Sequence, residues 1–261
     1  MSKRVKELLQ KEPAAKKFIR PLISAYEFLN GENRWCLWLK DISPAQLRAL
    51  PEVMKRVNAV REFRLQSTKA ATVKLADVPY LFAEIRQPEN DYVLIPIHSS
   101  ENRLYVPFAF FDKENIVHNS STALPNATLY HFGVLSSQMH MAWMRAVCGR
   151  IKSDNRYSNN IVYNNFPWAM NVSAKQKERV ERFAQDMLDA RKEFPDSSLA
   201  DLYDPSTMPK ILVDAHRALD KAVDLCYRPK SFKTELERLK FLFALYRQYT
   251  EPMKLAMDGE R

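Results

Sequence analysis

Hydrophobic positions follow two different patterns along the chain, and the change falls near residue 168. Before it, most apolar residues occur in short runs separated by Pro, Asn, Asp and Ser, which is typical of strands joined by turns. After it, apolar residues recur at helical spacing. The pattern predicts an α+β fold, with a mixed, mostly antiparallel sheet domain followed by a C-terminal helical bundle.

The first 168 residues divide into a basic, helix-forming lead-in over 1–30, expected to end near Pro21, and a mixed region over 31–168. Ser43 followed by Pro44 predicts a helix start, since Ser is a good N-cap and Pro suits the first turn. A helix is also expected over 139–147, ending at Gly149. The predicted strands cover residues 34–39, 80–85, 92–97, 104–111 and 128–135.

Residues 169–261 are expected to form a helical domain. Ser173 and Gln176 have the spacing of a capping box, and Pro195 marks the end of that helix. The second and third helices are predicted from apolar residues at helical spacing over 212–226 and 239–246. These apolar stripes are typical of a bundle core.

Charge is distributed unevenly between the two parts. Of the net charge of +9, residues 1–170 contribute +8 and residues 171–261 contribute +1. This asymmetry favours a polyanionic partner for the first part. Five cations cluster near one predicted helix, and they are either a solvated helix surface or a flank that faces phosphates: Lys55, Arg56, Arg61, Lys69 and Lys74.

Several classes of protein are disfavoured by composition. The chain has no apolar run near the ~18 residues of a membrane span, and its N-terminus is too polar for a signal peptide. Its three cysteines, far apart and odd in number, predict free thiols and a cytoplasmic protein with no membrane partner. Its four glycines cannot form a nucleotide-binding loop, so we expect no cofactor bound by this chain.

Two short sequences resemble catalytic motifs only superficially. Asn165-Phe166-Pro167-Trp168 is close to the tetrapeptide of amino-group DNA methyltransferases, but Phe stands where a rigid Pro is needed. We expect it to close a domain instead. Glu84-Ile-Arg86 has Arg where a nuclease motif has Lys. The five histidines lack metal-ligand spacing, and His131 and His140 are expected to be packed or on the surface.

The stretch from 149 to 168 contains many side chains that match the hydrogen-bonding groups of DNA base edges. Lys152 suits guanine O6 and N7, whereas Asp154 can accept from cytosine N4. In an extended segment, side chains two residues apart project the same way, so the two could contact both halves of one G·C pair. The alternative is a surface ion pair of little energetic consequence.

Long motifs spread over the chain resemble the C-terminal part of the MmeI-like family, from about Phe18 to Tyr249. They are RWCLWL (34–39), LPNATLYHFGVLSSQMHMAWMRAVCGR (124–150), YSNNIVYNNFPW (157–168), SLADLYDP (198–205) and FLFALYRQYT (241–250). The family comprises type IIL restriction–modification proteins and related S-adenosylmethionine-dependent DNA adenine-N6 methyltransferases. There, this part is a DNA target recognition domain followed by a helical domain.

The resemblance implies that the catalytic and S-adenosylmethionine motifs lie upstream, in a methyltransferase domain of the same parent protein. We therefore expect this chain to be an inactive part of a longer protein, with an artificial start at Met1. The implied partners are double-stranded DNA and that methyltransferase domain. The alternative is a non-catalytic protein-interaction module whose basic charge is incidental.

The resemblance also implies roles for individual residues. Lys152 and Asp154 match a pair that reads the base pair next to the methylated adenine, which implies that guanine follows this adenine. Arg156 matches a further recognition residue. Weaker candidates for DNA contact come from variable stretches and from the Asn-rich segment: Ser99, Ser100, Arg103, Asn119, Ser120, Ser121, Asn155, Asn159 and Asn160.

Overall fold

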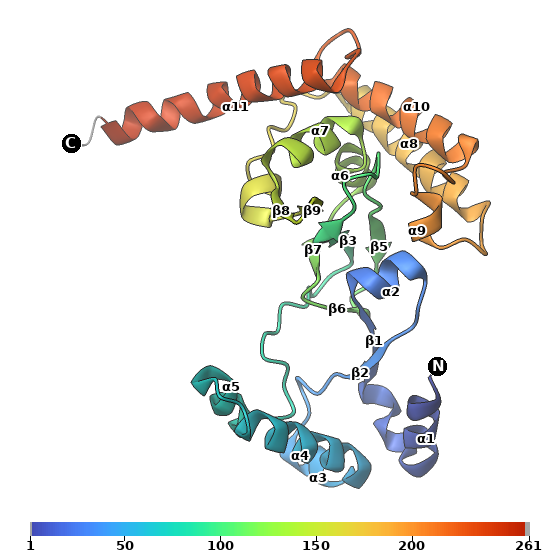
Figure 1. Cartoon of the computed structure of the whole chain (residues 1–261), viewed down its shortest axis with the longest axis vertical. Helices are drawn as coiled ribbons and strands as arrows, with labels where there is room; N and C mark the ends of the chain where they lie inside the picture. Colours follow the sequence, from blue (N-terminus) through green and yellow to red (C-terminus); the bar gives the residue numbers. More distant parts are fainter. Residues whose placement is uncertain (1, 259–261) are drawn as a thin grey trace.

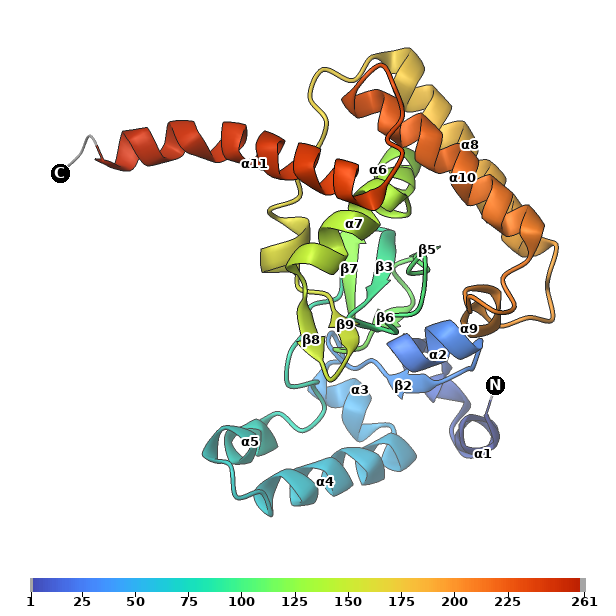
Figure 2. The same ribbon diagram turned by 45° about the horizontal axis from the view of Figure 1, so that its top comes forward.

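The computed structural model describes residues 2–258, with side chains as far as Glu251. Small sheets form the centre of the molecule, and the predicted α+β class is confirmed (Figure 1). The three longest helices, α8 (Ala174–Lys192), α10 (Lys210–Tyr227) and α11 (Glu235–Asp258), gather at one end, where α11 extends away from the body in both ribbon views (Figures 1 and 2). None of the helices within residues 2–258 is both long and apolar enough to cross a membrane.

The strands form three separate three-stranded sheets rather than one. Their orders are β2-β1-β6, β5-β3-β7 and β4-β9-β8, and every pairing is antiparallel except that of β1 with β6. The mostly antiparallel character was therefore predicted correctly. The strands are β1 (Ile19–Ile23), β2 (Trp35–Leu37), β3 (Tyr92–Pro96), β4 (His98–Ser99), β5 (Ala109–Phe111), β6 (Ile116–Val117), β7 (Ser121–Pro125), β8 (Gly149–Ile151) and β9 (Asp154–Arg156).

The first 30 residues are more than a helical lead-in. Helix α1 (Lys3–Lys11) and a 3₁₀ helix, η1 (Pro13–Phe18), lead into β1, the central strand of its sheet, and α2 (Ala25–Asn30) follows. Ile19 pairs with Leu37 and Leu22 pairs with Ile116, so this segment is hydrogen-bonded to residues far along the chain. The sequence did not indicate this strand, because its pairing partners are distant.

A small helical lobe is inserted between β2 and β3. Ser43 caps its first helix as predicted, because its hydroxyl accepts a hydrogen bond from the Gln46 N–H. Arg64 holds the far end together, since its guanidinium donates to the carbonyl oxygens of Leu75, Val78 and Leu81. The lobe comprises α3 (Pro44–Arg48), α4 (Pro51–Leu65), α5 (Ala70–Lys74) and the 3₁₀ helix η2 (Leu75–Asp77).

Two predicted strands are wrong. Residues 80–85 have no regular secondary structure, and Phe82 and Ile85 are exposed instead of paired in a sheet. Residues 128–135 contain helix α6 (Leu129–Leu135), with Thr128 and His131 capping its start. A Cβ on Gly133 would lie 2.8 Å from the Val180 side chain, so only glycine lets α6 approach the next domain this closely. Tertiary packing thus favours a helix over residues 128–135, and the local pattern of apolar residues does not indicate that packing.

The C-terminal helices agree with the predicted pattern. The Ser173–Gln176 capping box is formed, with each side chain accepting from the other residue's backbone N–H. The longest helices expose their polar sides and bury apolar stripes against α6 and α7. The helices from α7 onward are α7 (Gln138–Val147), α8 (Ala174–Lys192), α9 (Leu199–Leu202), α10 (Lys210–Tyr227) and α11 (Glu235–Asp258).

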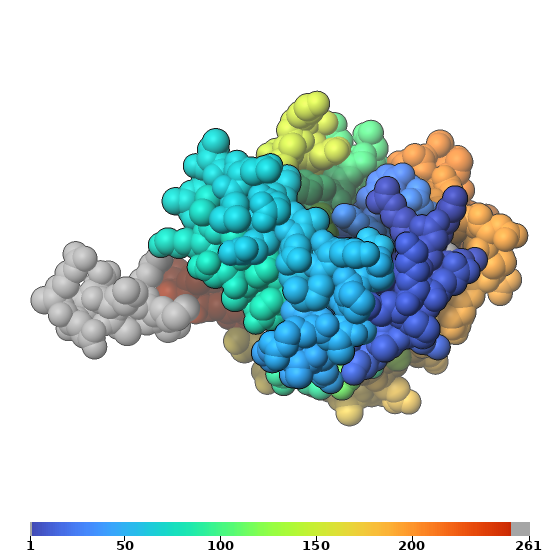
Figure 3. Space-filling view, turned by 90° about the horizontal axis from the view of Figure 1, so that it is seen from below, coloured from blue at the N-terminus to red at the C-terminus, as the bar shows by residue number. Residues whose placement is uncertain are grey.

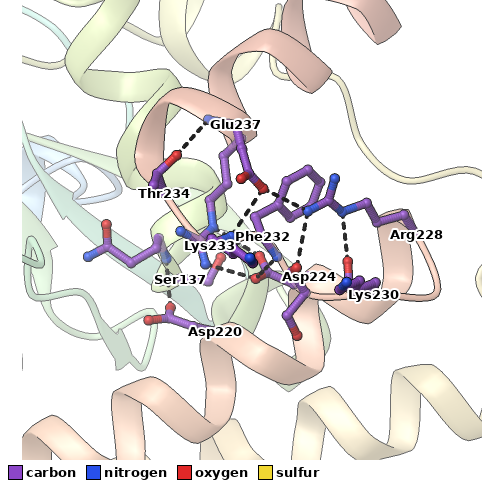
Figure 4. A network of polar contacts seen from close by, with 12 residues as sticks. Ser137, Asp220, Asp224, Arg228, Lys230, Phe232, Lys233, Thr234 and Glu237 are labelled. Carbon is purple, nitrogen blue, oxygen red and sulfur yellow. Dashed lines mark hydrogen bonds and ion pairs between the residues drawn. The ribbon is translucent and has the colours of Figure 1, made fainter.

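One continuous hydrophobic core joins the sheet region to the helices, and two carboxylates of α10 reinforce it (Figure 4). Asp220 accepts from the Tyr105 hydroxyl at 2.6 Å and from the Gln138 N–H, the first residue of α7, at 2.7 Å. Burial raises the pKa of Asp220 to about 6. Asp224 pairs with Arg238 of α11. Because the Asp220 contacts cross between the two regions, they help to hold the helices against the sheet region, whereas the Asp224 pair joins α10 to α11.

Buried His140 gives the fold a dependence on pH. Its ring Nδ1 lies 3.0 Å from the Leu135 carbonyl oxygen and its Nε2 lies 3.1 Å from the Tyr157 hydroxyl, an arrangement that suits neutral imidazole. Burial lowers the pKa of His140 to about 3. As the pH falls below about 6.5, the usual pKa of His, the unfolded chain therefore binds one more proton than the folded chain does.

We expect this His140 contribution to stability to be fully present above pH ~6.5 and to be lost toward pH ~3, at about 1.4 kcal/mol per pH unit. Urea unfolding between pH 4.5 and 6.5 measures that slope. The variant His140→Gln should have a shallower slope by about this amount, whereas substitution of exposed His98 by Gln should leave it unchanged. Equal slopes for His140→Gln and the unmodified chain would contradict the assignment.

Candidate nucleic-acid interface

Strands β8 and β9 form a hairpin at the C-terminal end of α7 (Figure 2). Ile151 pairs with Asp154, so Lys152 and Ser153 are the two residues of a tight turn. Lys152 has a φ of +54°, which suits the first position of a two-residue hairpin turn but costs a residue with a side chain about 1 kcal/mol. The other non-glycine residues with positive φ in the described part are Asn126 and Asn171. A long cation held in a strained turn points to a role for its side chain.

The hairpin changes the predicted geometry of the three main candidates. The prediction that Lys152 and Asp154 belong to one extended segment and project the same way is wrong, because the chain reverses direction between them. The alternation applies instead to Asp154 and Arg156, which are both exposed on the same face of β9. Lys152 lies at the tip, beside this face.

All three charges are free to meet a ligand. The ion pairs among the described residues include neither Lys152, Asp154 nor Arg156, so the alternative of a Lys152–Asp154 surface ion pair is not formed. Asp154 Oδ1 accepts only a long hydrogen bond, of 3.4 Å, from the Glu101 N–H. Arg150 stabilises the turn, since its guanidinium donates a hydrogen bond to the Ser153 carbonyl oxygen at 3.0 Å.

Two weaker candidates lie on the opposite, buried face of the same sheet. Ser99 pairs directly with Asn155 across β4 and β9, and both side chains are buried. The Cys148 thiol donates to Asn155 Oδ1 at 3.5 Å. The structure therefore corrects the prediction that Ser99 and Asn155 contact DNA, because cross-strand neighbours share a face and this face packs inward.

A hollow of about 700 Å³, lined by both polar and apolar residues, lies beside the hairpin at Gly149 and Arg156. It is open to solvent, and Figure 3 shows the yellow hairpin segment projecting on this side of the molecule, near the helical lobe. Asn119, Ser121, Arg156, Asn159 and Asn160 all line it, although they come from two separate segments of sequence. The remaining lining residues are Glu84, Arg86, Ile97, Val117, His118, Thr122, Ala123, Gly149, Tyr157, Ser158 and Ile161.

These lining candidates differ in how freely they can contact a ligand. Asn119, Asn159 and Asn160 are exposed, and the Asn159 amide donates to the Thr122 hydroxyl at 2.7 Å. Ser121 is buried, and its hydroxyl has no hydrogen-bond partner in the described part of the chain. Its neighbour Ser120 has a structural role, since its hydroxyl accepts from the Ala25 N–H at the start of α2.

Ser100 and Arg103 lie outside the hollow. The Ser100 hydroxyl accepts from the Asn102 N–H, which shapes a turn. Arg103 is half-buried: burial lowers its pKa, and the carboxylates of Asp204 and Asp154 act in the opposite direction. Its positive charge is therefore close to Asp154 and can influence what that carboxylate binds.

The closing tetrapeptide has a structural role. The Asn165 amide donates to the carbonyl oxygens of Asn160 and Ile161, which ties it to the π-helix η3 (Asn159–Tyr163). Phe166 and Pro167 are buried, and Trp168 stacks edge-on against Phe166. The Asn165 side chain, which is the polar group that a methyltransferase would use, is thus hydrogen-bonded to the backbone. This is what we expect of a segment that closes a domain.

The histidines and cysteines of the described residues form no metal-binding cluster. Within residues 2–258 no three His, Cys, Asp or Glu side chains lie close enough together to hold an ion. His140 is buried and His131 contacts Thr128, so both are packed as predicted. All three cysteines are free thiols.

Comparison with known proteins agrees with this geometry. Residues 1–170 match the MmeI target recognition domain, and residues 172–254 match the MmeI C-terminal domain. This chain belongs to the MmeI family. Both matched regions contribute to the large core described above, so the family's target recognition and C-terminal domains pack against each other here.

Two MmeI-family relatives are longer than this chain. DNA methyltransferase A of Bacillus subtilis (strain 168) is 37% identical over 245 residues, which cover 94% of this chain and 28% of that protein. The structure of the type IIL restriction–modification enzyme MmeI in complex with DNA superposes with a TM-score of 0.91 at 43% identity, over 96% of this chain and 34% of that one. The chain thus spans about a third of their lengths.

The sequence did not indicate Glu84, Arg86 or Thr122 as part of the candidate interface. Glu84 and Arg86 had been considered only as a nuclease motif. They join the hollow because the segment before β3 passes next to β6 and β7, which is a tertiary relation. No local pattern in the sequence would have identified them.

Proposed function

We propose that this chain is the sequence-specific, double-stranded DNA recognition module of an adenine-N6 methyltransferase. In this proposal an upstream methyltransferase domain of the parent protein binds S-adenosylmethionine and modifies the adenine. Both relatives support it, since one is a DNA methyltransferase and the other a restriction–modification enzyme whose structure is in complex with DNA. The described residues bind and select the site, and they take no part in the chemistry.

The observation that carries the proposal is the β8–β9 hairpin, which presents unpaired charges of both signs on one projecting element. A two-stranded ribbon fits the major groove of B-DNA. There, Lys152 at the tip would donate to guanine O6 and N7, and Asp154 would accept from cytosine N4. Arg156, on the same face as Asp154, would contact a neighbouring position. The modified adenine is then followed by guanine.

Binding to duplex DNA tests the proposal. We expect affinity for a mixed-sequence duplex to fall more than about tenfold between 50 and 200 mM salt, which corresponds to two or more neutralised phosphates. Fluorescence anisotropy at several salt concentrations measures the slope. Binding that is absent or insensitive to salt would contradict the proposal and support the protein-interaction module.

A further inference from the structure

Gln87 anchors the irregular segment before β3 at one point. The Gln87 side chain donates to the carbonyl oxygens of Lys113 and Asn115, at 3.0 and 2.9 Å, and accepts from the Val117 N–H at 2.9 Å. One side-chain amide therefore binds three backbone groups in and just before β6. The Tyr92 hydroxyl donates to the same Asn115 carbonyl at 2.6 Å. Gln87 is thereby fixed to the sheet region, although the residues just before it belong to no sheet.

Two of these residues carry opposite charges at the hollow. Arg86 Nη2 lies 2.7 Å from Glu84 Oε2, and the two side chains are 81% and 63% exposed. Both line the hollow, together with Arg156 and Asn159. An ion pair this exposed contributes little to stability, so both side chains can turn to a ligand in the hollow at little cost to folding.

We propose that Glu84 and Arg86 read a second G·C base pair. This inference rests on the proposed function, and it adds residues from a different part of the chain. Arg86 would donate two hydrogen bonds to guanine O6 and N7, and Glu84 would accept from the N4 amino group of the paired cytosine. The two side chains already lie side by side, as the two base edges do in the groove. Gln87 is the positioning residue, because it fixes the backbone that carries them.

Selection of duplexes from a randomised pool, followed by sequencing, tests the pair. The variant Glu84→Arg with Arg86→Glu keeps the net charge and exchanges the donor and the acceptor. We expect one position to change its preference from guanine to cytosine on the same strand, by roughly 10- to 100-fold. The adenine–guanine step assigned to Lys152 and Asp154 should stay enriched. Gln87→Ala should weaken the preference at the same position only, with Glu84 and Arg86 still present.

The matched control is Asp189→Lys with Lys192→Asp. This pair is also exposed and also 2.7 Å apart, but it lies on α8 away from the hollow. Its exchange should leave every preference unchanged. Thermal unfolding of each variant checks that the fold is kept.

Three results would overturn the inference, and they are distinguishable. An unchanged preference at every position contradicts the Glu84–Arg86 pair alone. A uniform loss of affinity, with a smaller salt slope and no change in preference, would make Arg86 a phosphate contact instead. No enriched sequence for the unmodified chain would contradict the proposed function, and this inference with it.

Discussion

Replacing Asp224 with alanine should lower the free energy of unfolding by about 3–5 kcal/mol. Asp224 is 1% exposed and accepts from Arg238 at both oxygens, at 3.0 and 2.8 Å, and from the Phe232 N–H at 3.1 Å. These bonds fix the turn between α10 and α11 (Figure 4). Removing the carboxylate leaves the Arg238 guanidinium, whose side chain is 11% exposed, without its counter-charge.

Urea unfolding at pH 7 measures the change. The matched control is Asp214→Ala on the same helix, where the carboxylate pairs with exposed Lys210 and Arg217. There we expect a loss of about 1 kcal/mol or less. Similar losses at the two positions would show that the buried pair does not hold α10 to α11.

The second large effect concerns the hairpin. Exchanging its charges, with Lys152→Glu and Asp154→Arg, should change the preferred base after the adenine from guanine to cytosine. Each good contact to a base edge contributes about 1–3 kcal/mol of discrimination, so the preference should change by roughly 10- to 100-fold. Competition between two duplexes that differ only at that base pair measures the ratio.

Lys152→Gly separates recognition from folding. Glycine removes the cation and also relieves the backbone at φ +54°, so the hairpin should keep or gain stability while the preference for guanine weakens. If the exchanged variant still prefers guanine, Lys152 and Asp154 do not read this base pair, even where DNA binding itself is retained.

The elements predicted correctly are those whose signals lie within the element. Helices α8 and α10 repeat their apolar positions over several turns, and Ser173 caps the first of them. Residues 128–135 were predicted wrongly because their hydrophobic run suits either a strand or a buried helix. The packing of Gly133 against Val180 decides for the helix, and that contact joins positions far apart in sequence.

The candidate interface was predicted in part. The motifs and the family resemblance pointed to Lys152, Asp154 and Arg156, and the structure places all three on one exposed hairpin. The turn itself was not foreseen, since Lys-Ser lacks the Asn-Gly or Asp-Gly signal of a tight hairpin. The burial of Ser99 and Asn155 follows from their cross-strand pairing, which local sequence does not encode.

DNA recognition by this chain can be tested by selection from a randomised duplex pool with the unmodified chain at moderate salt. We expect enrichment of a short motif that contains adenine followed by guanine. Enrichment of a motif without guanine at that step would keep the recognition module and contradict the assignment of Lys152 and Asp154. No enrichment, with no salt-dependent binding, would contradict the claim that this chain recognises DNA.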